Sequence, residues 1–265
     1  MGQVAGIYGR RSIRKYLNEE LQVGILEEIK EASRGVKRLY EDIDMDIHIL
    51  EDGIRFQSVT KGIIGGWGKI IAPHYIVVTS EKREGYLENI GFTLEEIVLS
   101  LGSLGIGTCF IGRGINQELL KSLLPIKENH EALYALSFGY PRNEESSRKR
   151  MLKWKKRMEI AEFASGQLTR TWRHILDTVK MAPVAMNTRP WKFHINDNRV
   201  DIYSMNRKSI FDWGSWEMNR IALGSALYHI YMAAKGLDKE ILIVQLEGNK
   251  KGDRRYIASI VESAE

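Results

Sequence analysis

Three arginines and a serine near the N-terminus have the residue types that bind phosphate. Arg10, Arg11 and Arg14 stand with Ser12 in the sequence G-R-R-S-I-R-K-Y, directly before the first expected helix. Guanidinium groups bind phosphate oxygens through bidentate, charge-assisted hydrogen bonds, and a hydroxyl adds a neutral donor. The segment therefore indicates an anion site, with a solvated basic N-terminal arm as the alternative interpretation.

A second candidate is the loop from Met181 to Phe193, M-A-P-V-A-M-N-T-R-P-W-K-F, between an expected helix and an expected strand. Pro183 and Pro190 each fix their own φ and push the preceding residue toward extended geometry, so the loop should be stiff. A stiff loop is suited to form one wall of the binding site of a flat ligand. A rigid connector anchored in the core by Trp191 is the alternative.

Other motifs fail as sites. The glycine-rich stretch 61–70, K-G-I-I-G-G-W-G-K-I, is no phosphate loop, because five residues separate Gly62 from Gly68 and no Ser or Thr follows Lys69. His48 falls on the polar side of an alternating strand and has no second histidine at ligand spacing, so we expect a surface histidine and no metal site. No pair of side chains has the spacing of a catalytic acid, base or nucleophile.

Composition fits a globular chain of one or two domains, with 265 residues of which 43% are hydrophobic and 28% charged. No apolar run approaches the ~18 residues of a membrane span, and no apolar segment follows the basic N-terminal residues as in a secretory signal. The single cysteine, Cys109, lies in an apolar run. It predicts a buried, inert thiol and a reducing, cytoplasmic location.

The net charge of +5 suits an anionic ligand or a nucleic acid. The densest basic run, 148–157, carries Met151, Trp154, Met158 and Ala161 at helical spacing. This pattern predicts an amphipathic helix with a solvated basic face rather than a nucleic-acid site.

The elements that must position these segments follow from hydrophobic periodicity. We expect helices at 21–36, 87–104 and 117–124 and strands at 45–49, 75–78, 108–111 and 133–138, with an Asp-Gly turn at 52–53 making a hairpin with a run from Ile54. The second half shows helices at 172–181 and 218–235, a hairpin of 191–195 with 200–203, and strands at 241–246 and 256–261. The sequence thus predicts an α+β (α/β layered) fold. The repeated order also suggests internal duplication.

Several segments together resemble the nitroreductase family of flavin enzymes. R-R-S-I-R-K-Y resembles the family's N-terminal flavin-binding motif, and A-P-H-Y-I-V-V, L-G-I-G-T-C-F-I-G and A-L-S-F-G-Y-P resemble later blocks in the same order. R-K-R at 148–150 resembles the basic tail that closes on the phosphate. The block A-P-S-S-x-N-x-Q-P-W is absent after the first helix, and a similar sequence appears at 182–191.

This displacement bears on domain organisation. In the family, each flavin lies at a dimer interface between the arginine motif of one subunit and the A-P-S-S-x-N loop of the other. Because this chain carries one motif in each half, the resemblance implies a fused, single-chain pseudo-dimer of nitroreductase-like fold with one composite site. We expect a first half at 1–145, a linker helix at 146–168 and a second, degenerate half at 169–265, in a monomer or a weak homodimer.

The resemblance implies that FMN is the cofactor, contacted at its phosphate, at the edge of its ring and on the ring face. The implied residues are Arg10, Arg11, Ser12, Arg148 and Arg150 at the phosphate, Arg14 at the pyrimidine edge, Gly112, Arg113 and Gly114 at the reactive nitrogen, and Pro183, Val184, Ala185 and Asn187 at the ring face. Lys61 or Lys69 would touch the polar edge of the ring. No side chain is expected to act as acid, base or nucleophile, since the flavin carries the chemistry.

The implied activity is reduction of a small-molecule acceptor, such as a nitroaromatic or a quinone, by NADH or NADPH, with no nucleic-acid or membrane partner. The family's two serines are Val184 and Ala185 here, and Arg189 replaces a glutamine. Each lost hydrogen bond weakens cofactor binding by about 0.5 to 1.5 kcal/mol. A flavin-binding or flavin-sequestering protein without turnover is therefore the alternative, and nucleic-acid binding, with its steep salt dependence, is a third hypothesis.

Overall fold

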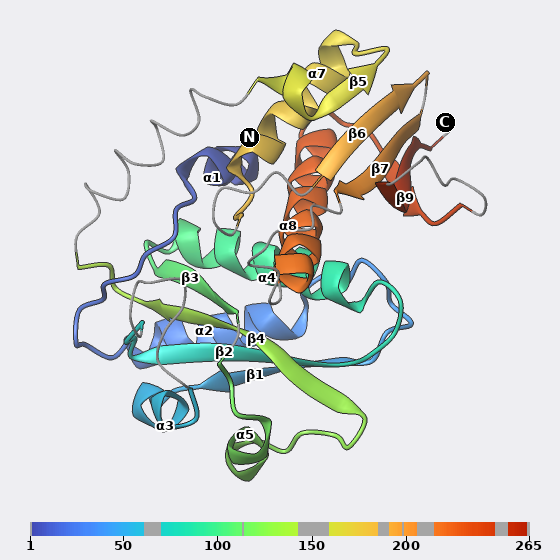
Figure 1. Ribbon diagram of the computed structural model, residues 1–265. Helices are drawn as coiled ribbons and strands as arrows, with labels where there is room; N and C mark the ends of the chain where they lie inside the picture. The colour runs from blue at the N-terminus through green and yellow to red at the C-terminus, as the bar shows by residue number, and fades with distance from the viewer. Residues whose placement is uncertain are drawn as a thin grey trace. The chain divides into compact units, whose positions relative to one another are not determined.

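The structure is a computed structural model that describes residues 2–60, 70–112, 114–142, 159–184, 191–197, 199–205, 215–246 and 254–263. Helices and strands alternate along the chain (Figure 1), which confirms the predicted α+β class. Contacts divide the chain into two compact units. The N-terminal unit comprises Arg10–Tyr86 and Glu96–Met151, and the C-terminal unit comprises Met1–Gly9, Leu87–Glu95 and Leu152–Glu265.

The N-terminal unit is built on a four-stranded antiparallel sheet with the order β1-β2-β4-β3. The strands are β1 (Met45–Leu50), β2 (His74–Glu81), β3 (Gly107–Gly112) and β4 (His130–Gly139). Helices α3 (Gly53–Ser58) and α5 (Gln117–Leu123) place Phe56 and Leu120 in one core with Tyr75 and Val77 of β2. Helix α2 (Val23–Arg34) contacts β1. β2 is buried on both faces except at its last residue, as its continuous apolar run predicts.

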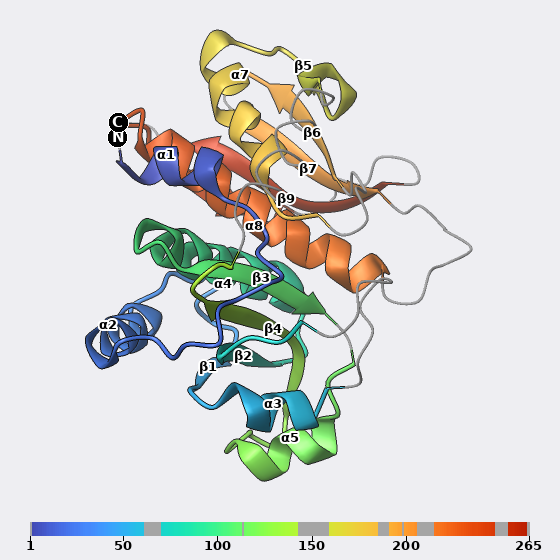
Figure 2. The same ribbon diagram turned by 90° about the vertical axis from the view of Figure 1, so that its left-hand side faces the viewer.

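The C-terminal unit is built on a five-stranded sheet with the order β5-β6-β7-β9-β8. Its strands are β5 (Ala164–Gly166), β6 (Trp191–Asn196), β7 (Arg199–Met205), β8 (Ile241–Val244) and β9 (Arg254–Glu262). Helix α8 (Ser215–Lys235) is buried along most of its length, and its buried residues include the polar Arg220 and His229 beside its apolar ones. Helices α1 (Gly2–Gly9) and α7 (Arg170–Asp177) contact it, and Figure 2 shows α1 lying along it.

The two sheets repeat one topology. In β1-β2-β4-β3 and in β6-β7-β9-β8 every neighbouring pair is antiparallel, and a long helix, α4 (Tyr86–Ser103) or α8, follows the second strand in sequence. Each central pair also has a register shift, between Val78 and Thr79 in one and between Ile202 and Tyr203 in the other. An internal duplication would account for this agreement between the two sheets. The duplication itself stays a prediction.

The first part of α4 meets α8 through a reciprocal contact of two glycines in the C-terminal unit. A Cβ atom at Gly91 would lie 2.0 Å from the Ile221 carbonyl oxygen, and one at Gly224 would lie 2.0 Å from that of Glu88. Each glycine therefore faces the carbonyl of the residue that stands three positions before the other glycine. Such reciprocity is the property of a contact about a two-fold axis.

The structure corrects two expectations and adds one helix that the sequence did not predict. The Asp-Gly turn is wrong: Asp52 is the N-cap of α3 and accepts a hydrogen bond from the Ile54 backbone N–H at 2.9 Å, while β1 pairs with β2 instead of a strand at Ile54. The end of the predicted linker helix forms the 3₁₀ turn η1 (Ile160–Glu162) and β5. Helix α1 was not expected, because its apolar residues lack a one-sided pattern.

We predict that the glycine contact is essential to stability. Gly91→Ala and Gly224→Ala should each lower the free energy of unfolding by about 3 kcal/mol, because the added methyl group collides with backbone that cannot move away freely. Urea denaturation measures the change. Gly102→Ala, near the end of α4 with nothing within 4 Å of its added Cβ, is the control and should be neutral or slightly stabilising. Equal effects at all three positions would contradict the prediction.

Candidate functional site

The predicted phosphate segment is held in an extended strip beside β3. The Ile13 backbone N–H donates to the Thr108 carbonyl at 2.7 Å, and Ser12 forms a parallel bridge with Thr108. Ile13 is buried against Gly107, where a Cβ atom would lie 2.7 Å from its side chain. The Tyr16 hydroxyl donates to the Ile13 carbonyl at 2.7 Å. Apolar anchors and backbone pairing therefore fix the segment.

Arg10, Ser12 and Arg14 gather around Cys109 of β3. Burial raises the pKa of the Cys109 thiol, while the positive charges of Arg14 and Arg10 and a side-chain hydrogen bond from Ser12 act to lower that pKa. Arg14 is exposed and the other two residues are half-buried, so none of the three is enclosed in the core. Two guanidinium groups and a hydroxyl in one short segment have the chemistry to attract an anion, and their role as a binding site stays a prediction.

Two of the residues predicted to contact the flavin stand at positions where the structure requires or favours glycine. A Cβ atom at Gly112, the end of β3, would lie 2.5 Å from the Tyr134 ring. Gly114 has a φ of +79°, a left-handed conformation that side chains disfavour. Arg11 is half-buried in the strip. A role for these residues toward a cofactor remains a prediction.

The proline loop is described only at its ends. Pro183 and Val184 are half-buried and follow η2 (Thr178–Met181) in the C-terminal unit. Trp191 is 1% exposed and begins β6, so its own side chain lies in the core as expected. The other predicted contacts lie outside the described residues: Arg113, Arg148, Arg150, Ala185, Asn187, Lys61 and Lys69. The composite site stays a prediction.

A buried ion pair that the sequence did not reveal lies beside the glycine contact. Arg220 donates from Nε and Nη2 to the two carboxylate oxygens of Glu88 at 2.5 and 2.7 Å, and the side chains are 3% and 0% exposed. The Arg220 guanidinium also lies 5.0 Å from the Trp216 ring centroid. A bidentate pair of this kind compensates the loss of water that the close helix contact imposes.

A second buried pair joins His229 to Glu95. His229 Nδ1 lies 3.0 Å from the Thr178 carbonyl oxygen, and because a carbonyl only accepts, Nδ1 carries a proton. His229 Nε2 lies 2.9 Å from Glu95 Oε1, so a hydrogen bond joins these two atoms. No sequence signal marks the pair, since its members stand 134 residues apart.

Comparison with known proteins assigns the family. A model of the family described as "Putative TM nitroreductase" matches residues 4–234. The chain belongs to this nitroreductase family. The recognition made from the motifs is confirmed, and the family places the chain among the nitroreductase-type oxidoreductases, a class of flavin enzymes.

One protein of similar sequence and one of similar structure are both described as putative nitroreductases. A protein of Archaeoglobus fulgidus named "Putative NADH dehydrogenase/NAD(P)H nitroreductase" is 25% identical over 147 residues, which are 52% of this chain and 84% of that protein. The crystal structure of a putative nitroreductase from Thermotoga maritima matches with a TM-score of 0.64 and 23% identity, over 99% of this chain and 93% of that one. This likeness confirms the predicted nitroreductase-like fold.

Two further sequence expectations concern the thiol and the membrane. Cys109 is free and buried, as its apolar run predicted. Within the described residues, no helix combines the length and apolar content needed to cross a bilayer.

His48, expected on the surface, is half-buried and hydrogen-bonded to the Thr79 hydroxyl at 3.1 Å, and burial lowers its pKa.

We predict that Arg220→Met lowers the free energy of unfolding of this nitroreductase by about 3 to 5 kcal/mol, because Glu88 is left charged and buried. Chemical denaturation measures the loss, and the double variant Glu88→Met/Arg220→Met should regain most of it. Arg83→Met removes an exposed pair with Asp42 and should cost less than about 1 kcal/mol. A double variant less stable than Arg220→Met would contradict this assignment.

We also predict that Cys109 is unreactive in the folded protein. Its raised pKa leaves less thiolate at any given pH, and its burial blocks access. Alkylation by iodoacetamide at mildly alkaline pH should be at least about tenfold slower in the native protein than in urea, and should accelerate as the pH rises. Equal rates in the native and unfolded chains would show that the thiol is exposed.

Proposed function

We propose that this nitroreductase binds FMN and passes electrons from NADH or NADPH to an electron-poor acceptor such as a nitroaromatic or a quinone. The observation that carries the proposal is the strip anchored beside β3 by the Ile13–Thr108 hydrogen bond, from which Arg10, Ser12 and Arg14 all act to lower the pKa of Cys109. Two guanidinium groups and a hydroxyl fit the phosphate and polar edge of a flavin nucleotide. When bound, FMN supplies the hydride acceptor and donor that the side chains lack.

The chain's own contribution is to bind and orient. Arg10, Arg11 and Ser12 hold the phosphate, with Arg148 and Arg150 as further contacts inferred from the family motif. Arg14 provides positive charge that favours an anionic ring. Gly112, Arg113 and Gly114 offer backbone N–H groups to the ring. No side chain is needed to transfer a proton to the ring in this proposal.

We further propose that the chain is a pseudo-dimer in which Pro183, Val184, Ala185 and Asn187 provide the opposite wall of one composite site. The repeated strand order and the reciprocal contact of Gly91 and Gly224 support an origin by duplication. The proposed halves are 1–145 and 169–265, joined by 146–168, in a chain that is monomeric or weakly dimeric. In this proposal the protein acts in the cytoplasm, and its electron acceptor is a small molecule.

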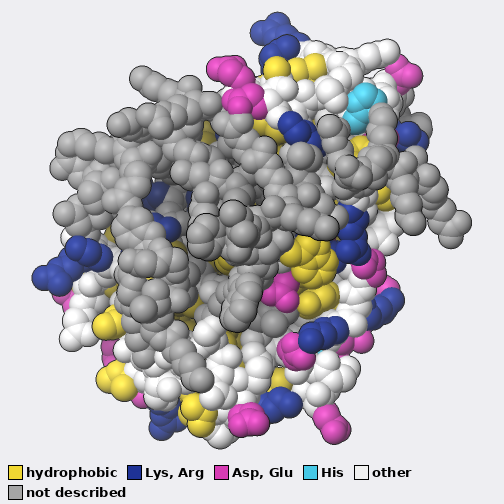
Figure 3. All heavy atoms as spheres, in the orientation of Figure 1, with side chains coloured by type: hydrophobic (Ala, Val, Ile, Leu, Met, Phe, Trp, Pro, Cys, Tyr) yellow, Lys and Arg dark blue, Asp and Glu magenta, His cyan; other side chains and the backbone are white. Residues whose placement is uncertain are grey.

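A flavin-binding protein without turnover is the second candidate. Val184 and Ala185 stand where the family has serines, so two hydroxyl donors to the flavin are missing. Nucleic-acid binding gains no support from the face in Figure 3, where described Lys and Arg side chains alternate with Asp and Glu. A visible spectrum with FMN, followed by anaerobic NADH and NADPH, separates the first two: bleaching supports the enzyme, and binding without bleaching supports the flavin carrier.

We predict that Arg10→Ala weakens FMN binding by about tenfold to a hundredfold, because it removes a charge-assisted hydrogen bond to the phosphate. Quenching of flavin fluorescence measures the affinity. Riboflavin, which lacks the phosphate, should bind the wild type more weakly than FMN and should lose little in the variant.

The matched control is Arg34→Ala, an exposed arginine of α2 paired with Glu31, which should leave FMN affinity unchanged. An equal loss of FMN and riboflavin affinity in Arg10→Ala would place Arg10 away from the phosphate. Absence of flavin binding in the wild type would contradict both proposed functions.

A further inference from the structure

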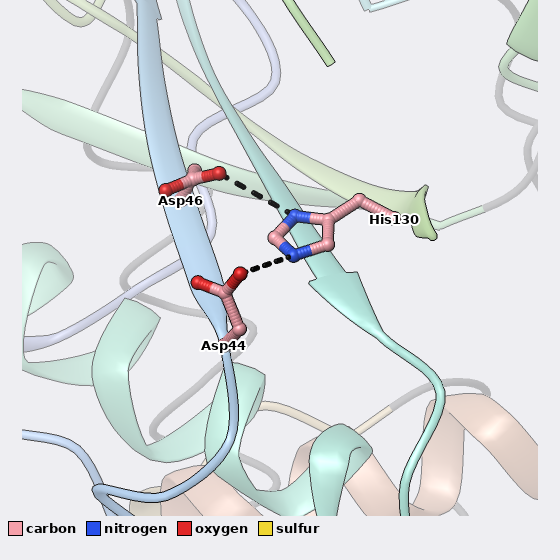
Figure 4. A group of neighbouring side chains, drawn as sticks. All are labelled: Asp44, Asp46 and His130. Atoms are coloured by element: carbon pink, nitrogen blue, oxygen red, sulfur yellow. Dashed lines mark ion pairs between the residues drawn. The ribbon is translucent and has the colours of Figure 1, made fainter. Parts of the chain in front are cut away.

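Three side chains with metal-ligand chemistry meet at one end of the N-terminal sheet. Asp44 directly precedes β1, Asp46 is the second residue of β1, and His130 begins β4 (Figure 4). One ligand atom from each lies within 4.8 Å of the other two, in the part of the chain that the structure describes. Two carboxylates and an imidazole are ligands of first-row divalent cations.

His130 is buried and directed into the pair of carboxylates. Its side chain is 0% exposed, with Nε2 3.2 Å from Asp44 Oδ2 and Nδ1 3.4 Å from Asp46 Oδ2 (Figure 4). Despite this distance, Nε2 has no hydrogen bond of acceptable geometry within the described residues. A buried ring nitrogen without a hydrogen bond is costly, and a bound cation would satisfy it.

Spacing and surroundings fit a ligand role for Nε2. In a tetrahedral zinc site with bonds of about 2.0 to 2.1 Å, neighbouring ligand atoms lie about 3.3 Å apart, close to the observed separation of Nε2 and Asp44 Oδ2. The Thr79 hydroxyl lies 3.3 Å from His130 Nδ1. When Nδ1 donates to the Thr79 hydroxyl, the lone pair is on Nε2, as metal-binding histidines require, and Asp46 is left to contact the ion.

The two carboxylates already bind a positive charge, the ammonium group of Lys127. Its Nζ lies 2.8 and 2.7 Å from the two oxygens of Asp44 and 3.1 Å from Asp46 Oδ2. The Lys127 side chain is 46% exposed, so it can turn into solvent without disturbing the core. The two carboxylates therefore bind one positive charge, and the Lys127 ammonium group that supplies it can be replaced by a metal ion.

We propose that Asp44, Asp46 and His130 bind a first-row divalent cation of the zinc type, and that Lys127 replaces the ion when it is absent. The ion would link β1 to β4 across β2, which lies between them in the sheet. The site is separate from the proposed flavin site. Thr108, which pairs with Ser12, is opposite Phe138 near the end of β4, whereas His130 is its first residue. The imidazole disfavours Mg²⁺ and Ca²⁺, which prefer oxygen ligands.

The test is a titration of the full chain, stripped of metal with a chelator, with Zn²⁺ alone in a calorimeter. We expect one saturable site that excess Mg²⁺ does not block. Asp46→Asn should weaken Zn²⁺ binding at least about tenfold, and His130→Gln should remove it. Lys127→Met should tighten it by about tenfold, because no ammonium group then has to be displaced.

The control is Asp42→Asn, an exposed acid of the same region that is paired with Arg83, which should bind Zn²⁺ like the wild type. If His130→Gln does not fold, Asp46→Asn and Lys127→Met decide the question, since both positions are partly exposed. The proposal is overturned if the wild type has no saturable Zn²⁺ site. It is equally overturned if neither Asp46→Asn nor Lys127→Met changes the affinity.

Discussion

The close backbone contact between α4 and α8 is the constraint on which the C-terminal unit depends. Gly91 and Gly224 allow the two helices to approach until there is no room for a Cβ atom. An approach this close excludes water, so each charge beside it needs a partner. Arg220 provides that partner for Glu88, and a hydrogen bond joins His229 to Glu95. Steric fit and charge pairing thus specify the same helix alignment.

In the N-terminal unit, the residues that anchor one strip to the sheet stand next to the residues that we propose bind the cofactor. Ile13 and Tyr16 are buried and hydrogen-bonded to the sheet, while Arg10, Ser12 and Arg14 remain within reach of a ligand. The phosphate site that we propose would need no glycine-rich loop, because positive charge on a fixed backbone would provide the attraction. This arrangement gives the nitroreductase assignment a physical basis in the chain itself.

The same sheet has opposite electrostatic character at its two ends. The arginine strip lies beside the start of β3, which pairs with the end of β4. Asp44 and Asp46 lie near the first residue of β4, where they hold Lys127. Because the two groups are at opposite ends of β4, an anion at one and a cation at the other do not compete for the same residues.

Sequence alone determined the long elements, since α4, α8 and β2 carry periodic or continuous apolar runs, and its ordered motifs determined the family. The prediction from sequence failed where one dipeptide is compatible with two local structures. Asp52 caps helix α3 here, although Asp-Gly is also common in hairpin turns. Only the tertiary structure decided the polar partners, such as Glu88 with Arg220, 132 residues apart, and Asp44 with His130. Periodicity shows which face of an element is buried, but the partner that covers it depends on long-range register and packing.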